Sequence, residues 1–195
     1  MKNLIILLII FLSFTNCLMT TNASVTRYAQ KIQEQSVSLN ALKALKEEKR
    51  CQEYYDYIVA ADLVLSTKNT KMTGKMLADA WYETLTNFNI DVPVTLALAQ
   101  AYLESSFCNS KLSKQKNNPY SLKSGKSYAS YSSLELGVSS YYKVIAKRYL
   151  QCKTLDQLLK DFSTCEGYRY AGSKNYEYIL KNQIQSYDII LAENK

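Results

Sequence analysis

Glu104 is the residue of this sequence that is best placed for acid chemistry. It is the only carboxylate between residues 92 and 118, and it lies in an apolar segment with helical spacing. Asp91 and Pro93 come just before this segment, in the order typical of a helix N-terminus, so Glu104 is expected near the helix C-terminus. Partial burial and the negative end of the helix dipole both disfavour the ionised form, so we expect a raised pKa for Glu104. A carboxylic acid that stays protonated near neutral pH can protonate a glycosidic oxygen.

The elements that must position Glu104 are helices. Only five glycines and two prolines occur in 195 residues, and apolar residues recur three and four apart, which predicts an all-α fold. In the helix of Glu104, bulky apolar residues form one face and small residues form the other. We expect an N-terminal helical extension over residues 24–70 and a catalytic helical domain over residues 71–195. Residues 109–130 are the longest polar and irregular stretch, and long loops in compact domains often carry function.

The first 23 residues have the layout of a secretory signal. Lys2 is followed by an apolar run over residues 4–14, which is shorter than the roughly twenty apolar residues that a membrane span needs. A buried N-terminal helix is the alternative. Two ways of processing this segment stay open. One is ordinary cleavage after residue 23, and the other is lipidation of Cys17 in a segment similar to a bacterial lipobox. We therefore expect an exported protein that is periplasmic, anchored to the membrane by a lipid, or secreted.

The cysteines favour disulfides over metal chemistry. Five are present, and four remain once Cys17 is removed or lipidated. Four cysteines allow three connectivities. Cys152 and Cys165 bracket a short segment and could pair, and Cys51 would then pair with Cys108. Four unpaired thiols are the alternative. Histidine is absent and no Cys-x-x-Cys pair occurs, which argues against a zinc site and a Ser-His-Asp triad, so no cofactor is expected.

Four short motifs occur in an order that is known from one enzyme family. They are Leu98-Ala99-Gln100-Ala101-x-x-Glu104-Ser105, Asn117-Asn118-Pro119-Tyr120-Ser121-Leu122-Lys123, Tyr128-Ala129-Ser130-Tyr131-Ser132-Ser133 and Tyr170-Ala171-Gly172-Ser173-Lys174-Asn175-Tyr176. Together they resemble the bacterial glucosaminidases of glycoside hydrolase family 73, over about residues 76–190. The resemblance implies a lysozyme-like helical fold that cleaves the glycan of peptidoglycan next to N-acetylglucosamine.

The resemblance also implies roles for the motif residues. Glu104 would be the general acid, and Tyr170 matches the family's active-site tyrosine, which could orient a water or the acetamido group of the substrate. Substrate contacts are expected for five further residues, which are Gln100, Asn118, Tyr120, Tyr131 and Tyr176. For Asn118 and Tyr120 the alternative is an asparagine that fixes the loop and a tyrosine of the core. The expected partner is the peptidoglycan glycan strand, bound by a monomer without a metal.

The charge of the chain fits an anionic polymer. Lysine and arginine exceed aspartate and glutamate by seven, or by six without Lys2. Peptidoglycan carries lactyl-peptide carboxylates, and the lysines of residues 109–126 would lie beside a cleft that follows Glu104. Nucleic acid is the rival partner for a basic chain, and export argues against it. A loop that lysines merely keep solvated is the alternative reading of this segment.

Two departures from the family pattern concern the mechanism. Ser105-Ser106-Phe107 replaces the commoner Ser/Thr-Gly-Trp and is closer to the lytic transglycosylases of the same fold, whose Gly-Leu-Met-Gln loop is absent. Residues 109–134 contain no Asp or Glu, and Glu135 belongs to an expected capping box that begins at Ser132. The mechanism is thus expected to work mostly with one carboxylate. A lytic transglycosylase, or a cell-wall-binding or assembly protein without catalysis, stays the alternative.

Overall fold

The computed structural model describes the backbone of residues 2–194 and the side chains of residues 27 and 29–194. The chain divides into two compact units, Met1–Cys51 and Gln52–Lys195. The first unit is helical and belongs to α1 (Lys2–Leu65), and its described side chains up to Lys49 are exposed. The predicted signal segment and Cys17 lie outside the described side chains and stay predictions. No helix in the described part of the chain is both long and apolar enough to span a bilayer.

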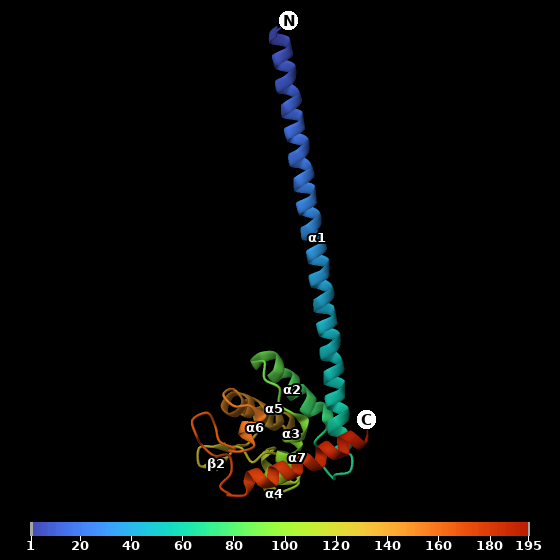
Figure 1. The fold of residues 1–195 in the computed structure, drawn as a ribbon. Helices are drawn as coiled ribbons and strands as arrows, with labels where there is room; N and C mark the ends of the chain where they lie inside the picture. The colour runs from blue at the N-terminus through green and yellow to red at the C-terminus, as the bar shows by residue number, and fades with distance from the viewer. Residues whose placement is uncertain (1, 195) are drawn as a thin grey trace. The chain divides into compact units, whose positions relative to one another are not determined.

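The second unit is built almost entirely from helices (Figure 1). After the end of α1 come α2 (Gly74–Phe88), α3 (Val94–Ser105), α4 (Lys111–Lys116), α5 (Leu134–Val144), the π-helical turn η1 (Ile145–Leu150), α6 (Leu155–Leu158) and α7 (Tyr176–Glu193). A short antiparallel hairpin of β1 (Lys123–Ser124) and β2 (Ser127–Tyr128) is the only sheet in the described residues. The all-α prediction is therefore confirmed. The stretch 109–130 is less irregular than expected, because it contains α4 and this hairpin.

The helix that carries Glu104, α3, is buried on every side over residues 95–101. It packs along α7, while α2 packs against α5 (Figure 1). The bulky face and the small face are therefore both buried over these residues, because neighbouring segments enclose a helix that is apolar nearly all round. Pro93 precedes its first turn in place of the expected cap, Asp91, whose carboxylate accepts the indole N–H of Trp81 (2.7 Å).

Capping residues explain where two later helices begin. Ser133 caps α5 by accepting the N–H of Leu136, one residue later than the expected capping box. The capping box lies at α6, where the Thr154 hydroxyl accepts the N–H of Gln157 and the Gln157 side chain accepts the N–H of Thr154. Such a cap stabilises a helix by about 1 kcal/mol.

The last turns of α1 belong to the core of the second unit. Tyr57 stacks on Trp81 with ring centroids 5.0 Å apart, and its hydroxyl donates to the carbonyl of Val92 (2.9 Å). The compact unit therefore begins after Cys51, whereas composition suggests a boundary near residue 70, and a catalytic domain over residues 71–195 stays a prediction. The difference arises because aromatic and apolar residues at the end of α1 join the core, which a polar linker in the sequence does not reveal.

Candidate active site

Glu104 lies half-buried in the last turn of α3, where the chain leaves the helix through a left-handed turn. The three residues after Ser105 have φ angles of 51°, 59° and 64°. This region costs a residue with a side chain roughly 1–2 kcal/mol, so the surroundings must hold the turn. Ser105 does so, since its hydroxyl accepts the N–H of Cys108 (2.7 Å) and donates to the carbonyl of Pro119 (2.6 Å). The end of α3 is thereby fixed against the loop before β1.

Burial and one hydrogen bond shift the pKa of the Glu104 carboxyl in opposite directions. Burial raises the pKa of Glu104 above its ordinary value, in the direction expected. The Tyr176 hydroxyl, at the start of α7, donates to Oε1 of Glu104 (3.1 Å) and lowers that pKa by a smaller amount. Because a general acid must be protonated when it acts, a raised pKa extends its working range to higher pH.

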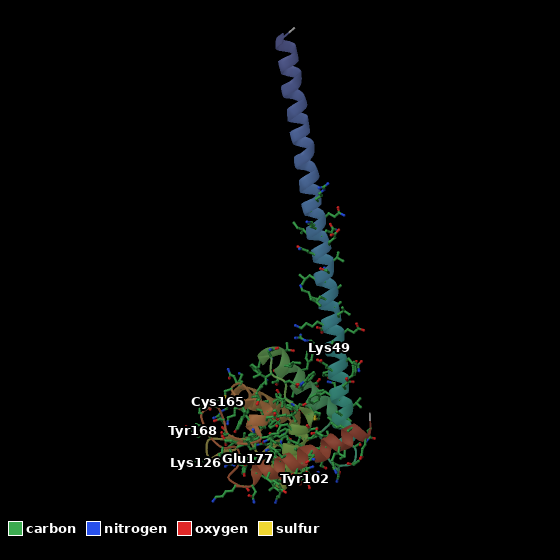
Figure 2. All side chains as sticks on the ribbon, in the orientation of Figure 1. Lys49, Tyr102, Lys126, Cys165, Tyr168 and Glu177 are labelled. Atoms are coloured by element: carbon green, nitrogen blue, oxygen red, sulfur yellow. A yellow bond between two sulfur atoms is a disulfide. The ribbon has the colours of Figure 1, made fainter. Side chains whose placement is uncertain are left out.

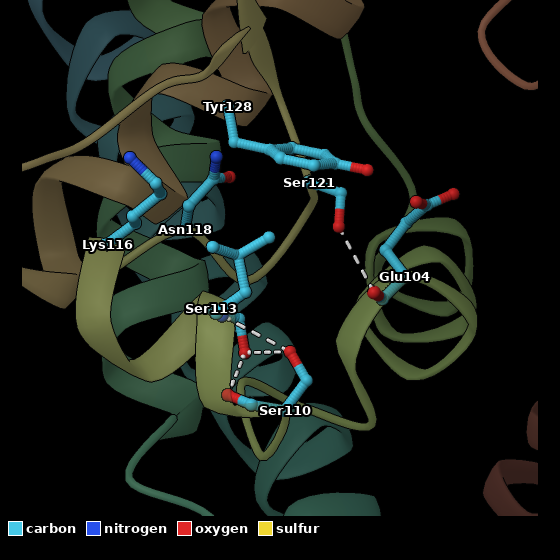
Figure 3. Close-up of a pocket in the computed structure, with 8 residues that line it drawn as sticks. Glu104, Ser110, Ser113, Lys116, Asn118, Ser121 and Tyr128 are labelled. Atoms are coloured by element: carbon cyan, nitrogen blue, oxygen red, sulfur yellow. Dashed lines mark hydrogen bonds between the residues drawn. The ribbon is translucent and has the colours of Figure 1, made fainter.

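Two cavities meet at Glu104. The smaller has a volume of about 150 Å³ and lies over α4, and the larger has about 430 Å³ and extends to η1 and the loop before α7. Glu104, Ser121 and Tyr128 line both cavities. In the close-up of the smaller cavity, the Tyr128 ring extends from the β-hairpin toward Glu104 (Figure 3). An extended ligand that fills both cavities therefore passes Glu104 at their junction.

The charges around this junction are mostly positive. Lys116 lines the smaller cavity, and Lys123, Arg148 and Arg169 line the larger one. Among the described residues that line the two cavities, Glu104 is the only carboxylate. A cleft with this balance of charge attracts an anionic ligand.

Glu135, the nearest candidate for a second acid, lines neither cavity. It is exposed in the first turn of α5. Hydrogen bonds from its own backbone N–H and from the Ser133 hydroxyl hold its pKa below the ordinary value. This environment suits a carboxylate that stabilises a helix N-terminus.

Four of the five residues expected to contact substrate are buried, and three of these, Gln100, Asn118 and Tyr120, are used in the core and the loop. Gln100 and Tyr120 have no exposed surface, and Tyr120 stacks on Tyr141 with ring centroids 3.6 Å apart. Asn118 borders the smaller cavity, yet its amide group donates to two backbone carbonyls and its oxygen accepts the N–H of Leu122 (3.0 Å). These side chains hold the loop and the core, and a direct sugar contact is not open to Gln100 or Tyr120 in this structure.

The other two expected contacts lie differently. Tyr131 is half-buried and lines the larger cavity, so its contact with a sugar stays a prediction. Tyr176 contacts the acid itself, and its hydroxyl oxygen accepts a hydrogen bond from Nε2 of Gln100 (2.9 Å). Oε1 of Gln100 accepts in turn from the Tyr141 hydroxyl. Sequence reasoning missed Tyr141, because no motif marks it.

Tyr170 reaches the larger cavity on a loop that folds back on itself. Its N–H donates to the carbonyl of Phe162 (3.0 Å), and its hydroxyl donates to the carbonyl of Tyr120 (2.7 Å). Its ring stacks on that of Tyr176, with centroids 5.9 Å apart. Tyr168, on the same loop, is 67% exposed and also lines this cavity. Its side chain is labelled in Figure 2. The loop thus brings two phenols to the cleft. Tyr170 is held by its hydrogen bond and its stacked ring, and Tyr168 is exposed.

A disulfide between Cys152 and Cys165 ties this loop to the segment after η1, and this pairing is confirmed. Cys51 and Cys108 are free thiols in this structure, and their pairing stays a prediction. Cys51 is exposed in the first unit, whereas Cys108 is buried in the second. The even number of cysteines therefore corresponds to one bridge among the described residues.

The larger cavity is also lined by residues that sequence reasoning did not single out as part of the site, which are Ser121, Tyr128, Arg148, Tyr149, Tyr168 and Arg169. Tyr128 opens the third motif, three residues before Tyr131, so its place in that motif was a usable signal. Arg148 lies in η1, far from any motif, and only the packing of η1 beside the cleft reveals it.

An all-α unit with one half-buried carboxylic acid at a cleft has the arrangement of a lysozyme-like glycoside hydrolase. The model of the glucosaminidase family, described as mannosyl-glycoprotein endo-beta-N-acetylglucosaminidase, matches residues 78–189. The chain therefore belongs to the glucosaminidase family. Membership supports peptidoglycan hydrolase activity in general terms, with peptidoglycan as substrate and action outside the cytoplasm. A comparison with curated proteins finds no match.

Proposed function

We propose that the protein hydrolyses the glycan strand of peptidoglycan next to N-acetylglucosamine, with Glu104 as the general acid. The observation that carries the proposal is the half-buried Glu104 at the junction of two cavities, with a raised pKa. Sugars on both sides of a scissile bond need room on both sides of the acid, and the leaving oxygen then lies beside it.

Glu104 protonates the leaving oxygen, and positive charge then develops at the anomeric carbon. This charge is met by the acetamido group of the substrate or by a water on the opposite face. Tyr170 is suited to orient either one, because its own hydroxyl hydrogen is engaged by the carbonyl of Tyr120. Its oxygen is left as an acceptor for a water O–H or an acetamido N–H.

The cations of the cleft fit the charge of this substrate. Lys116, Lys123, Arg148 and Arg169 line the cavities, and peptidoglycan presents lactyl-peptide carboxylates along its glycan. Tyr131 adds a ring that can stack against a sugar. Export with cleavage of the signal or lipidation of Cys17, and action as a monomer, are parts of the same proposal.

A lytic transglycosylase is the second candidate, because a single carboxylate lines the described cavities. Such an enzyme uses one glutamate and forms an anhydro product in place of adding water. The two reactions therefore differ in the end of the released fragment and not in the bound polymer.

The test is a digest of purified murein by the purified protein, with the released muropeptides identified by mass. Reducing-end N-acetylglucosamine is the expected product. Anhydro-muramyl ends would assign the protein to the transglycosylases. Neither product across a range of pH and salt would reject the enzyme proposal in favour of a wall-binding protein.

A further inference from the structure

Glu104 stands at the end of a chain of buried polar side chains. Tyr141 donates to Oε1 of Gln100, Nε2 of Gln100 donates to the Tyr176 oxygen, and Tyr176 donates to Oε1 of Glu104. We infer that this chain positions Glu104 so that Oε1 accepts a hydrogen bond and Oε2 carries the proton that is given to the substrate. The inference makes Gln100, Tyr141 and Tyr176 positioning residues and rests on the proposed function for the transfer itself.

Gln100 fixes the direction of the chain. Its amide has a distinct acceptor end, which meets Tyr141, and a distinct donor end, which meets Tyr176 (2.9 Å). A reversed chain would require this amide to turn over inside a packed core, where Gln100 and Tyr141 have no exposed surface. Because the Tyr176 oxygen receives the amide hydrogen, its own hydrogen is left to donate to Glu104 in either protonation state.

This direction distinguishes the two oxygens of the carboxyl. Oε1 is occupied as an acceptor (3.1 Å), and Oε2 has no hydrogen-bond partner in the described part of the chain. A protonated carboxyl that accepts at one oxygen bears its hydrogen on the other. The carboxyl is therefore held in one orientation before substrate binds, which lowers the cost of proton transfer.

Other ionisable groups face Glu104 across the two cavities. The cations are Lys116, Lys123, Arg148 and Arg169, and the phenols besides Tyr176 are Tyr128, Tyr131, Tyr149, Tyr168 and Tyr170. In the described residues none of these side chains donates to the Glu104 carboxyl, whereas Tyr176 does. A substitution at Tyr176 leaves all of these groups in place. A change in the pKa of Glu104 therefore reports on the hydrogen-bond chain of Tyr141, Gln100 and Tyr176.

The first experiment needs no substrate. The Glu104 carboxyl is titrated by carbon-13 NMR in the intact protein and in the Tyr176→Phe and Gln100→Met variants. We expect a higher pKa in Tyr176→Phe, because the donor that stabilises the ionised form is lost, and a shift in the same direction in Gln100→Met. The double variant should shift no further than Tyr176→Phe alone. Tyr178→Phe, on the exposed face of α7, is the matched control and should leave the pKa unchanged.

The second experiment measures turnover of murein against pH. Tyr176→Phe should lower kcat about tenfold with little change in KM, and its activity should persist to higher pH than that of the native protein. An unchanged Glu104 pKa in folded Tyr176→Phe overturns the inference, whether or not murein is cleaved. A shifted pKa in a protein that cleaves no murein rejects the proposed function and keeps the positioning chain.

Urea unfolding of each variant checks that it is folded. If Gln100→Met does not fold, Tyr141→Phe takes its place, since it removes the first donor of the chain and keeps the stacked ring. It should move the pKa of Glu104 in the same direction by a smaller amount. Separate, additive effects of Tyr141→Phe and Tyr176→Phe would overturn the inference.

Discussion

On its α7 side, Glu104 meets buried side chains that are hydrogen-bonded to one another, whereas on its cavity side it meets exposed rings and cations. Gln100 has no exposed surface and Tyr176 is 7% exposed. On the other side, Tyr168 is 67% and Tyr128 is 40% exposed, and both line the larger cavity. The described residues that form this hydrogen-bonded side, Tyr141, Gln100 and Tyr176, carry no charge, whereas the open side, which is the lining of the two cavities, contains four cations.

This difference separates two tasks. A proton donor has to keep one orientation, which requires neighbours that are fixed by packing and by their own hydrogen bonds. A long and variable polymer has to bind and leave, which suits side chains that can adjust their positions. We therefore expect changes on the buried side to act on kcat and on the pKa of Glu104, and changes to the cations of the open side to act mainly on KM and on salt dependence.

The largest effect is expected at the boundary of the two sides. Glu104→Gln barely changes the shape of the side chain but removes the acid, and loss of a general acid lowers the rate by about 10²–10⁴. Murein binding should persist, because the cations and rings of the open side remain. Glycan cleavage and co-sedimentation with murein measure the two properties separately.

Glu135→Gln is the matched control for this change. Its carboxylate lies outside both cavities, so turnover should stay as in the native protein. Full biological activity in Glu104→Gln would favour a wall-binding protein over an enzyme. A loss of equal size at Glu135 would show that the site contains a second acid.

The next effect concerns the loop that carries Tyr170 on the open side. Replacing both Cys152 and Cys165 by serine removes a closed loop whose ends are 13 residues apart, which should lower the free energy of unfolding by about 3 kcal/mol. Urea unfolding measures the loss, and Cys51→Ser, which changes an exposed free thiol, should leave the stability unchanged. The pKa of Glu104 should not move in the folded double variant. A shift would mean that the two sides are not independent.

A smaller effect is expected from the Tyr170 hydroxyl. Tyr170→Phe keeps the ring and removes the oxygen that is proposed to accept from a water or an acetamido group, so turnover should fall about tenfold, or roughly 1.4 kcal/mol of barrier. Tyr168→Phe on the same loop is the control and should be nearly neutral, since its side chain is exposed. Equal losses of turnover at both positions would mean that the loop acts only through packing. A loss at Tyr168 alone would show that the motif register is wrong.

The parts of the site that sequence predicts are those that depend on near neighbours in the chain. The raised pKa of Glu104 follows from the apolar helix around it, and the Cys152–Cys165 bridge follows from a short separation. Tyr131 and Tyr170 reach the larger cavity, as the order of the motifs suggests. In each case the signal is local.

The parts of the site that the sequence does not reveal depend on contacts between distant segments. Gln100 belongs to a motif with Glu104, which suggests a surface role, but α3 is buried on every side over residues 95–101. Tyr176 meets Glu104 across 72 positions of sequence, and Tyr141 meets Gln100 across 41. Helical periodicity shows that such residues share faces with apolar neighbours, but it does not show which helix covers them.

The smallest expected effect comes from single cations of the open side. Lys123→Gln and Arg148→Gln each remove one positive charge from the larger cavity while leaving Glu104 and its buried neighbours unchanged. Interactions between exposed charges are weak and screened by salt, so we expect kcat/KM on murein to fall by about threefold at low ionic strength, with kcat nearly constant.

Salt dependence separates this charge effect from lost packing. The difference between each variant and the native protein should shrink as salt is added, because ions screen the charge that the native protein still has. Lys181→Gln, on the exposed face of α7 and outside both cavities, removes the same charge from the chain and should leave kcat/KM unchanged. If Lys181→Gln has the same effect as Lys123→Gln, only the net charge of the protein matters. If kcat falls and the pKa of Glu104 moves in Lys123→Gln, the open side also positions the acid, and the division of tasks between the two sides fails.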